Sequence, residues 1–272
     1  MTAHVALREA GLPQVDLTAV VAEYVHPLAF ATVSGAHLYG FPSTDSDVDL
    51  RGAHLLSVKD IVGLRHPVET VSRMWDRDGV EMDLVTHDLA KFARLLLSPN
   101  GYVLEQLLSP LVVHTTSAHA ELVSLAPKLV TSLHARHYQG FATTQQRLYA
   151  KTGELKPLLY TFRVLLSGIH LMRSGHLVAH LPTLIENERE YSPTYLPDLI
   201  AAKASAEHLP ADACIVPIGP ERLDADLATL RARLDEVQRL TRLPAEPSAE
   251  SAVNDLIIRA RVAAMRCRRP TP

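Results

Sequence analysis

The feature that most constrains this chain is a run of carboxylates at residues 45–49, within the segment S-T-D-S-D-V-D-L. Asp47 and Asp49 flank Val48. In an extended strand, alternate residues face the same side, so the two aspartates share one face while Val48 faces the core. Two carboxylates held side by side repel each other unless a cation lies between them. The spacing therefore predicts a strand that presents a cation-binding pair.

The residues before this run predict a binding loop. A short apolar segment at residues 30–33 leads into Ser34 and Gly35. We expect a strand, a tight turn and a helix that opens at Gly35, because glycine permits close approach of the backbone to a ligand. The first N–H groups of such a helix are available to phosphate oxygens. Ser34, Gly35 and Ala36 are therefore predicted to bind a nucleotide triphosphate.

A third carboxylate is expected from a second strand. Residues 79–86 read G-V-E-M-D-L-V-T, in which polar and apolar residues alternate, as in a strand of the same sheet. Asp83 alternates with Met82 and Leu84, and it is the best candidate for a partner of the first pair. Glu81 lies on the same face and is the alternative.

Together these carboxylates predict a metal site. Mg2+ or Mn2+ prefers hard oxygen ligands and is held by a few carboxylates together with substrate phosphates, so Asp47, Asp49 and Asp83 are predicted metal ligands and catalytic residues. In a two-metal mechanism, one ion binds the phosphates of a nucleoside triphosphate and the other lowers the pKa of an acceptor hydroxyl. The alternative is that Asp45, Asp47 and Asp49 are turn residues with no catalytic role.

The rest of the chain changes period. Helical spacing begins after His87, and long helical stretches are expected at residues 117–150, 156–175 and 223–240. We therefore predict an α+β protein in which a catalytic domain at residues 1–115 forms a mixed sheet with flanking helices. A helical substrate-binding module is expected at residues 116–272.

At this point the sequence resembles a known family. A glycine turn followed about ten residues later by Asp-x-Asp is similar to the nucleotidyltransferase motif of the DNA polymerase beta superfamily. Tyr39 and Gly40, the run S-D-V-D-L-R-G, and the segment L-A-K-F-A-R-L-L-L-S-P-N-G-Y-V-L-E-Q-L-L-S-P resemble the RlaP-like branch, whose members are associated with RNA repair. The resemblance covers roughly residues 30–185. It implies a polymerase-beta-like fold that transfers a nucleoside monophosphate to a hydroxyl group, with RNA as the acceptor.

One position departs from the family pattern. The family usually has serine after the turn glycine, whereas this chain has Ala36 there and Ser34 on the other side of Gly35. We expect backbone N–H groups and Ser34 to replace the usual contact between a hydroxyl and a phosphate.

Several cations are candidates for phosphate binding. Arg51 follows the carboxylate strand, and Lys91 and Arg94 lie on the next helix. Lys156 and Arg163 lie seven residues apart on one helical face, and the resemblance places that helix beside the nucleotide. The alternative is that their stems pack on the core and their charged ends reach solvent.

The charge balance limits the acceptor. The formal net charge is -3, with 27 Lys and Arg against 30 Asp and Glu, so no global positive field would hold nucleic acid. RNA contacts must therefore be local. A cationic small molecule such as an aminoglycoside, or a protein hydroxyl, is the alternative acceptor, and a catalytically weak nucleotide-binding module is the third hypothesis.

The cellular location is predicted from absences in the sequence. The two cysteines, Cys214 and Cys267, lie far apart and lack zinc-site spacing. The N-terminus has no signal-peptide pattern, and no apolar run is long enough to span a membrane. We therefore expect a cytoplasmic protein without a membrane segment.

Overall fold

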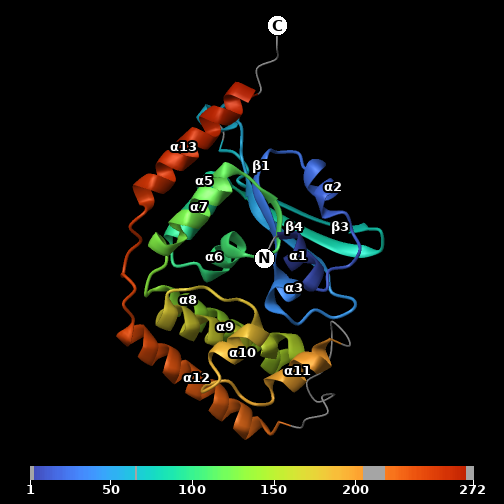
Figure 1. The fold of residues 1–272 in the computed structure, drawn as a ribbon, viewed down its shortest axis with the longest axis vertical. Helices are drawn as coiled ribbons and strands as arrows, with labels where there is room; N and C mark the ends of the chain where they lie inside the picture. Colours follow the sequence, from blue (N-terminus) through green and yellow to red (C-terminus); the bar gives the residue numbers. More distant parts are fainter. Residues whose placement is uncertain (1–2, 65, 205–217, 268–272) are drawn as a thin grey trace. The chain divides into compact units, whose positions relative to one another are not determined.

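The structure of the protein is a computed structural model that describes residues 3–64, 66–204 and 218–267 (Figure 1). Cys214 lies outside the described residues. The chain divides into two compact units. The first comprises Met1–Gly35, Asp47–Leu129 and Pro247–Pro272, and the second comprises Ala36–Ser46 and Val130–Glu246.

The first unit is built on a five-stranded sheet with the strand order β3-β4-β2-β1-β5. The strands are β1 (Leu28–Val33), β2 (Val48–His54), β3 (Thr70–Arg77), β4 (Val80–Asp88) and β5 (Val112–Thr115). Strands β2 and β4 pair in parallel, whereas β1 pairs antiparallel with β2 and β5, and β3 pairs antiparallel with β4. The predicted mixed sheet is confirmed.

Strands β1 and β2 are almost completely buried. All six residues of β1, L-A-F-A-T-V, are buried, and six of the seven residues of β2 are buried. Strand β4 alternates instead, with Met82 and Leu84 buried and the residues between them half-buried. The expected alternation around Asp83 is therefore present, and it directs that side chain away from the core.

Along the chain, the helices of the first unit come before, between and after the strands of the sheet. They are α1 (Ala3–Glu9), α2 (Leu17–Ala22), α4 (Val58–Val62), α5 (Leu89–Leu97), α6 (Gly101–Leu108), α7 (Ser117–Leu125), the short 3-10 helix Ala126–Lys128 and α13 (Glu250–Cys267). Asp88 joins two of them to the sheet. Its carboxylate accepts the N–H of Ala90 at 3.0 Å, which caps α5, and it pairs with Arg261 of α13 at 2.5 Å.

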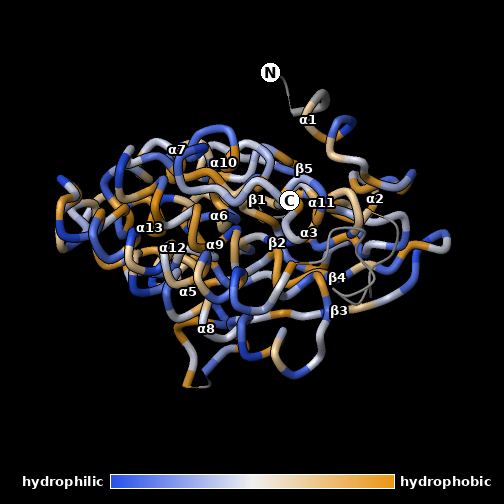
Figure 2. Tube along the Cα trace, turned by 90° about the horizontal axis from the view of Figure 1, so that it is seen from below, coloured by the Kyte–Doolittle hydropathy of each residue, from blue (hydrophilic) through white to orange (hydrophobic). Residues whose placement is uncertain are grey.

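The second unit consists of helices. They are α3 (Gly35–Tyr39), α8 (His134–Thr152), α9 (Leu155–Ser174), α10 (Leu181–Asn187), α11 (Leu196–Lys203) and α12 (Pro220–Leu240). Helix α9 is buried along most of its length and packs against α8, α10, α11 and α12. The predicted stripe of α12 is buried, with Leu223, Leu227, Leu230, Leu234 and Val237 on one face. Polar and apolar residues alternate along the helical traces in Figure 2.

The two compact units have other boundaries than the single one predicted between residues 115 and 116. Helices α7 and α13 belong to the first unit, and α13 packs on α5 and α7. The segment Ala36–Ser46, which follows the glycine turn, belongs to the second unit. The assignment of catalysis to one part and substrate binding to the other stays a prediction. Among the described helices, none is both long enough and apolar enough to cross a membrane.

Close approach of two strands generates the first prediction. A Cβ added to Gly52 would lie 2.2 Å from the carbonyl oxygen of Phe30, which is main chain and has no rotamer to change. We expect Gly52→Ala to lower the free energy of unfolding by at least about 2 kcal/mol, as overpacking does. Urea denaturation measures it.

Gly140→Ala is the matched control. Gly140 lies inside α8 with nothing within 4 Å of an added Cβ, so the same substitution should raise stability by about 0.5–1 kcal/mol. Equal effects of the two substitutions would contradict the close packing of β1 on β2.

His54, at the end of β2, generates a prediction about pH. Its side chain is fully buried, its Nδ1 lies 2.8 Å from Thr86 Oγ1, and its ring stacks on His26 at 4.9 Å. Burial, and then the neighbouring His26, lower the pKa of His54 from 6.5 to about 4. The folded pKa lies below the unfolded value, so this contribution to stability is complete above pH 6.5 and is lost as the pH falls toward 4.

We therefore expect the wild type to lose more stability between pH 7.5 and pH 5 than His54→Asn does. Urea denaturation at both pH values tests this difference, which separates His54 from other buried histidines such as His134, whose pKa is also lowered to about 4. An identical pH dependence in the two proteins would show that His54 is accessible to protons.

Candidate active site

Parallel pairing of β2 and β4 brings two of the predicted carboxylates together. Asp49 and Asp83 are direct partners in the register of the two strands. Their chain neighbours Val48, Leu50, Met82 and Leu84 are all buried. Because alternate residues face opposite sides, both aspartates emerge on the other face of the sheet, and their side chains are 17% and 20% exposed.

The glycine turn lies against the same carboxylate. Gly35 has a φ of 62°, a conformation that favours glycine, and an added Cβ would lie 1.8 Å from Asp49 Oδ2. The N–H of Ser34 donates to the carbonyl oxygen of Asp49 at 2.9 Å. The Ser34 hydroxyl is buried and has no hydrogen-bond partner among the described residues. The turn and the carboxylate strand therefore form one packed feature.

Arg51 lies between the two carboxylates. Its Nη2 donates to Asp49 Oδ1 at 2.5 Å and to Asp83 Oδ2 at 2.7 Å. Its Nε donates to the hydroxyl of Tyr102 in α6 at 3.0 Å. Burial by itself would lower the pKa of Arg51, but Tyr102 and the two carboxylates outweigh it and raise that pKa above its ordinary value. Arg51 therefore carries its positive charge at neutral pH.

The sequence did not lead us to predict the ion pairs of Arg51 with Asp49 and Asp83. It suggested instead that Arg51 neutralises phosphate. The signal for the ion pair with Asp49 was present, because Arg51 is two residues beyond Asp49 on the same strand and so shares its face. In this structure its guanidinium is bonded to the protein and not presented as a phosphate ligand.

Asp47 occupies a different position from the pair. It precedes β2 and is half-buried. Over the described ranges, no three His, Cys, Asp or Glu side chains are arranged to hold a metal ion. The structure thus brings Asp49 and Asp83 together without Asp47, and the metal-binding role of all three stays a prediction. Glu81, the alternative to Asp83, is exposed at the start of β4.

The remaining predicted residues lie in the second unit. Ala36 is buried, and its carbonyl oxygen accepts the N–H groups of Gly40 and Phe41 at 3.0 and 3.2 Å, which closes α3. Lys156 is half-buried in the first turn of α9.

Arg163 differs from both sequence-based interpretations. It is 1% exposed, and its guanidinium carbon lies 3.6 Å from the centroid of the Tyr39 ring. It therefore neither extends to solvent nor presents its charge at a surface. Its contact with Tyr39 joins α9 to α3 inside the helical unit, as a buried cation–π interaction.

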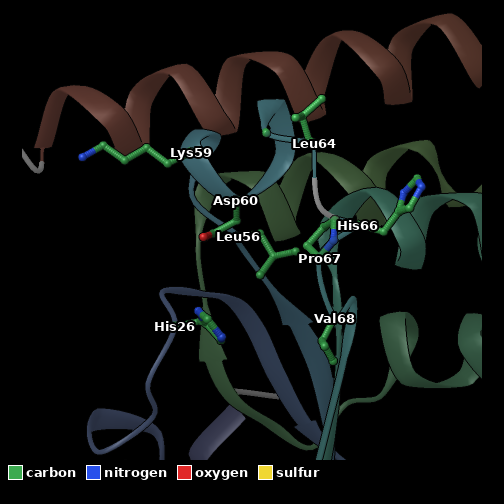
Figure 3. A pocket seen from close by; sticks show the side chains of 9 residues that line it. His26, Leu56, Lys59, Asp60, Leu64, His66, Pro67 and Val68 are labelled. Carbon is green, nitrogen blue, oxygen red and sulfur yellow. The ribbon is translucent and has the colours of Figure 1, made fainter.

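A pocket of about 630 Å3 in the first unit is separate from these residues (Figure 3). Its polar lining residues are His26, Lys59, Asp60 and His66. No residue predicted for the site lines it. The carboxylate of its one acid, Asp60, is bonded to Ser57, where it completes the cap of α4. The pocket therefore offers no carboxylate pair.

The sequence features that predicted a nucleotidyltransferase of the polymerase beta type were a glycine turn and an Asp-x-Asp about ten residues later. In the structure the second aspartate of that motif, Asp49, lies against Gly35 and in register with Asp83. A family model described as the RNA repair pathway DNA polymerase beta family, RlaP, matches residues 12–259. The chain belongs to this family. The match extends beyond the resemblance found at residues 30–185.

Two individual proteins are also similar. An uncharacterized protein of Methanocaldococcus jannaschii is 34% identical over 152 residues, which are 54% of this chain and 60% of that protein. The crystal structure of a nucleotidyltransferase-like protein from Exiguobacterium sibiricum aligns with 81% of this chain and 72% of its own, with a TM-score of 0.30 and 12% identity. That structural similarity is too low to support a conclusion.

The contact between Gly35 and Asp49 generates a prediction. We expect Gly35→Ala to destabilise the protein through both its left-handed backbone and the collision with Asp49 Oδ2. Gly153→Ala is the control, because Gly153 has a φ of 68° but nothing within 4 Å of an added Cβ. Gly35→Ala should cost at least about 1 kcal/mol more in urea denaturation, in line with an added overpacking cost.

A double-mutant cycle isolates the collision. In an Asp49→Ala background, the cost of Gly35→Ala should fall toward that of Gly153→Ala. The collision with the carboxylate is then removed, while the backbone strain and the 3.1 Å contact with the Cβ of residue 49 remain. An unchanged cost would show that the carboxylate does not rest on the glycine.

Proposed function

We propose that this protein is a metal-dependent nucleotidyltransferase that transfers a nucleoside monophosphate from an NTP to an acceptor hydroxyl and releases pyrophosphate. The observation that carries this proposal is the in-register pair of Asp49 and Asp83 beside the Gly35 turn. Family membership supports the reaction class. Fold alone would be a weak argument, since function depends on the site.

The residues fit a divalent cation. Asp49 and Asp83 supply hard carboxylate oxygens on one face of the sheet. Asp47 precedes Asp49 by two residues and stays a proposed ligand, although the described residues hold no group of three such side chains around one metal position. Arg51 contacts one oxygen of each carboxylate in the pair, so the second oxygen of each is not bonded to it. When bound, Mg2+ or Mn2+ supplies neutralisation of phosphate charge and activation of the acceptor hydroxyl.

The chain's own groups orient the substrates. Gly35, with no side chain, leaves room for the Asp49 carboxylate, and the turn of Ser34, Gly35 and Ala36 is the proposed contact to the nucleotide phosphates. The buried Ser34 hydroxyl, which has no hydrogen-bond partner among the described residues, is the proposed replacement for the serine missing at Ala36. The carboxylate of Asp83 accepts the proton of the acceptor hydroxyl through Oδ1, the oxygen that Arg51 does not contact. Lys156 stays a proposed contact to the nucleotide, as the sequence suggested.

RNA is the proposed acceptor, and membership of an RNA repair pathway family supports this proposal. Most of the cationic side chains that were expected to bind RNA are buried or already bonded to other residues of the protein. Arg51 is paired with carboxylates, Arg163 is buried, and Lys91 donates to Thr70 Oγ1 at 2.6 Å. These positions, with the net charge of -3, favour a second candidate acceptor, a cationic small molecule such as an aminoglycoside. A protein hydroxyl and a catalytically weak binding module are the remaining alternatives.

The activity is tested with each labelled NTP and Mg2+, with and without total RNA. We expect label to enter RNA, and Asp49→Asn and Asp83→Asn to lower the rate by roughly 100-fold or more, since each 1.36 kcal/mol of lost transition-state stabilisation is tenfold. Chelation of the metal should stop transfer. Asp78→Asn, an exposed substitution in the β3–β4 turn, is the control and should retain the wild-type rate.

Two outcomes would redirect the proposal. A loss of activity in Glu81→Gln with full activity in Asp83→Asn would move the role to the alternative carboxylate. Transfer to RNA should fall steeply as salt rises from about 50 to about 200 mM, because phosphate contacts release counterions. Labelling of an aminoglycoside and of no RNA would assign the small-molecule acceptor.

A further inference from the structure

The guanidinium of Arg51 has all of its donors in use. Nη2 donates to the two carboxylates and Nε donates to Tyr102. Nη1 donates to the carbonyl oxygens of Leu50 at 3.0 Å and of Asp83 at 2.8 Å. A guanidinium has five N–H groups, and here each has an acceptor.

Three of these acceptors fix Arg51 independently of the carboxylates. Two are main-chain carbonyls, which cannot move without disturbing the strands, and the third is the Tyr102 hydroxyl. The side chain is only 9% exposed. Withdrawal of the guanidinium would leave buried polar groups without partners, which is costly. Arg51 is therefore a fixed part of the site and not a mobile phosphate ligand.

The position of Arg51 changes the charge that a cation would meet. Asp49 and Asp83 on neighbouring strands would repel each other in the absence of a counter-charge. Arg51 bonds one oxygen of each and brings the net charge of the three side chains from -2 to -1. A divalent cation is accordingly attracted less strongly than it would be by two unpaired carboxylates.

We propose that Arg51 is a resident counter-ion that stays on the Asp49–Asp83 pair, positions both carboxylates before a metal arrives, and keeps metal binding weak until nucleotide phosphates add their own charge and ligands. This inference rests on the proposed function, because it treats the two carboxylates as metal ligands. Arg51 is then a positioning residue for the nucleotide–metal complex. Metal alone binds poorly, and metal with NTP binds well.

Mn2+ binding without nucleotide is the first test, measured by electron paramagnetic resonance. Arg51→Met removes the positive charge, and we expect Mn2+ to bind at least about tenfold more tightly than to the wild type. Nucleotidyl transfer by the same variant should fall, because the carboxylates are no longer held. A purely structural defect would weaken both Mn2+ binding and nucleotidyl transfer. Tighter Mn2+ binding together with slower transfer therefore identifies Arg51 as the counter-ion.

Arg77→Met is the matched control. Arg77 forms an ion pair with Glu23 at 2.9 Å on β3, so the substitution removes the same charge from another acid in the same unit. Its Mn2+ affinity should equal that of the wild type. Unchanged or weaker Mn2+ binding in folded Arg51→Met would overturn the inference, as would equal tightening in Arg77→Met.

The wild type supplies a second test that does not depend on how a variant folds. The Nε–H resonance of Arg51, identified by its shift in Tyr102→Phe, should exchange slowly with water both in the free protein and with Mg2+ and a non-hydrolysable NTP. Exchange as fast as that of an exposed arginine in the loaded protein would show that Arg51 leaves the carboxylates, and it would overturn the inference.

The outcomes separate this inference from the proposed reaction. Tighter Mn2+ binding in Arg51→Met, with no nucleotidyl transfer to any acceptor, would support the counter-ion and remove the proposed function. Transfer by the wild type, with Mn2+ affinity independent of Arg51, would retain the function and remove the counter-ion. Absence of Mn2+ binding in both proteins would overturn the inference together with the metal site.

Discussion

The repulsion between two carboxylates on adjacent parallel strands is the constraint on which the candidate site depends. Parallel pairing of β2 with β4 fixes Asp49 opposite Asp83, and the buried residues on either side prevent a shift by one residue. A positive charge on the same face relieves this repulsion. Arg51 supplies that charge, and Tyr102 of α6 and two main-chain carbonyls hold it there.

Sequence periodicity predicted the elements whose burial is one-sided or complete. The alternation around Asp83 and the leucine stripe of α12 were found because burial imposes a period of two on a strand and 3.6 on a helix. Strand β3 was not predicted. It lies at the edge of the sheet, most of its residues are partly or fully exposed, and T-V-S-R-M-W-D-R carries no clean alternation. Strand β5 is only four residues long and none of them is buried.

The sequence pattern did not predict the partners of the charged side chains in the site. Arg51 and Arg163 were both assigned to phosphate, yet one is bonded to carboxylates and the other is stacked on Tyr39. A strand face or a helix face is visible in the sequence, but the partner across it comes from another element. For Arg51 one partner, Asp83, lies 32 residues away, and for Arg163 the tyrosine lies in a separate helix. Such partners are set by tertiary packing.

Each residue around Asp49 in β2 has a packing or charge role that restricts which side chain can stand there. Val48 and Leu50 fill the core beneath the sheet, and Arg51 neutralises the pair. Gly52 lets the main chain of β1 approach, because any side chain there would meet the carbonyl oxygen of Phe30. An aspartate pair in a surface turn would need none of these neighbours. The interpretation of these aspartates as turn residues therefore fails for Asp49 on physical grounds: a solvated turn does not require a buried strand, a saturated guanidinium and a close backbone contact around one carboxylate. Burying charge is costly unless the charge is paired and hydrogen-bonded, and under the function we propose the two convergent carboxylates are kept because they hold a cation against phosphate.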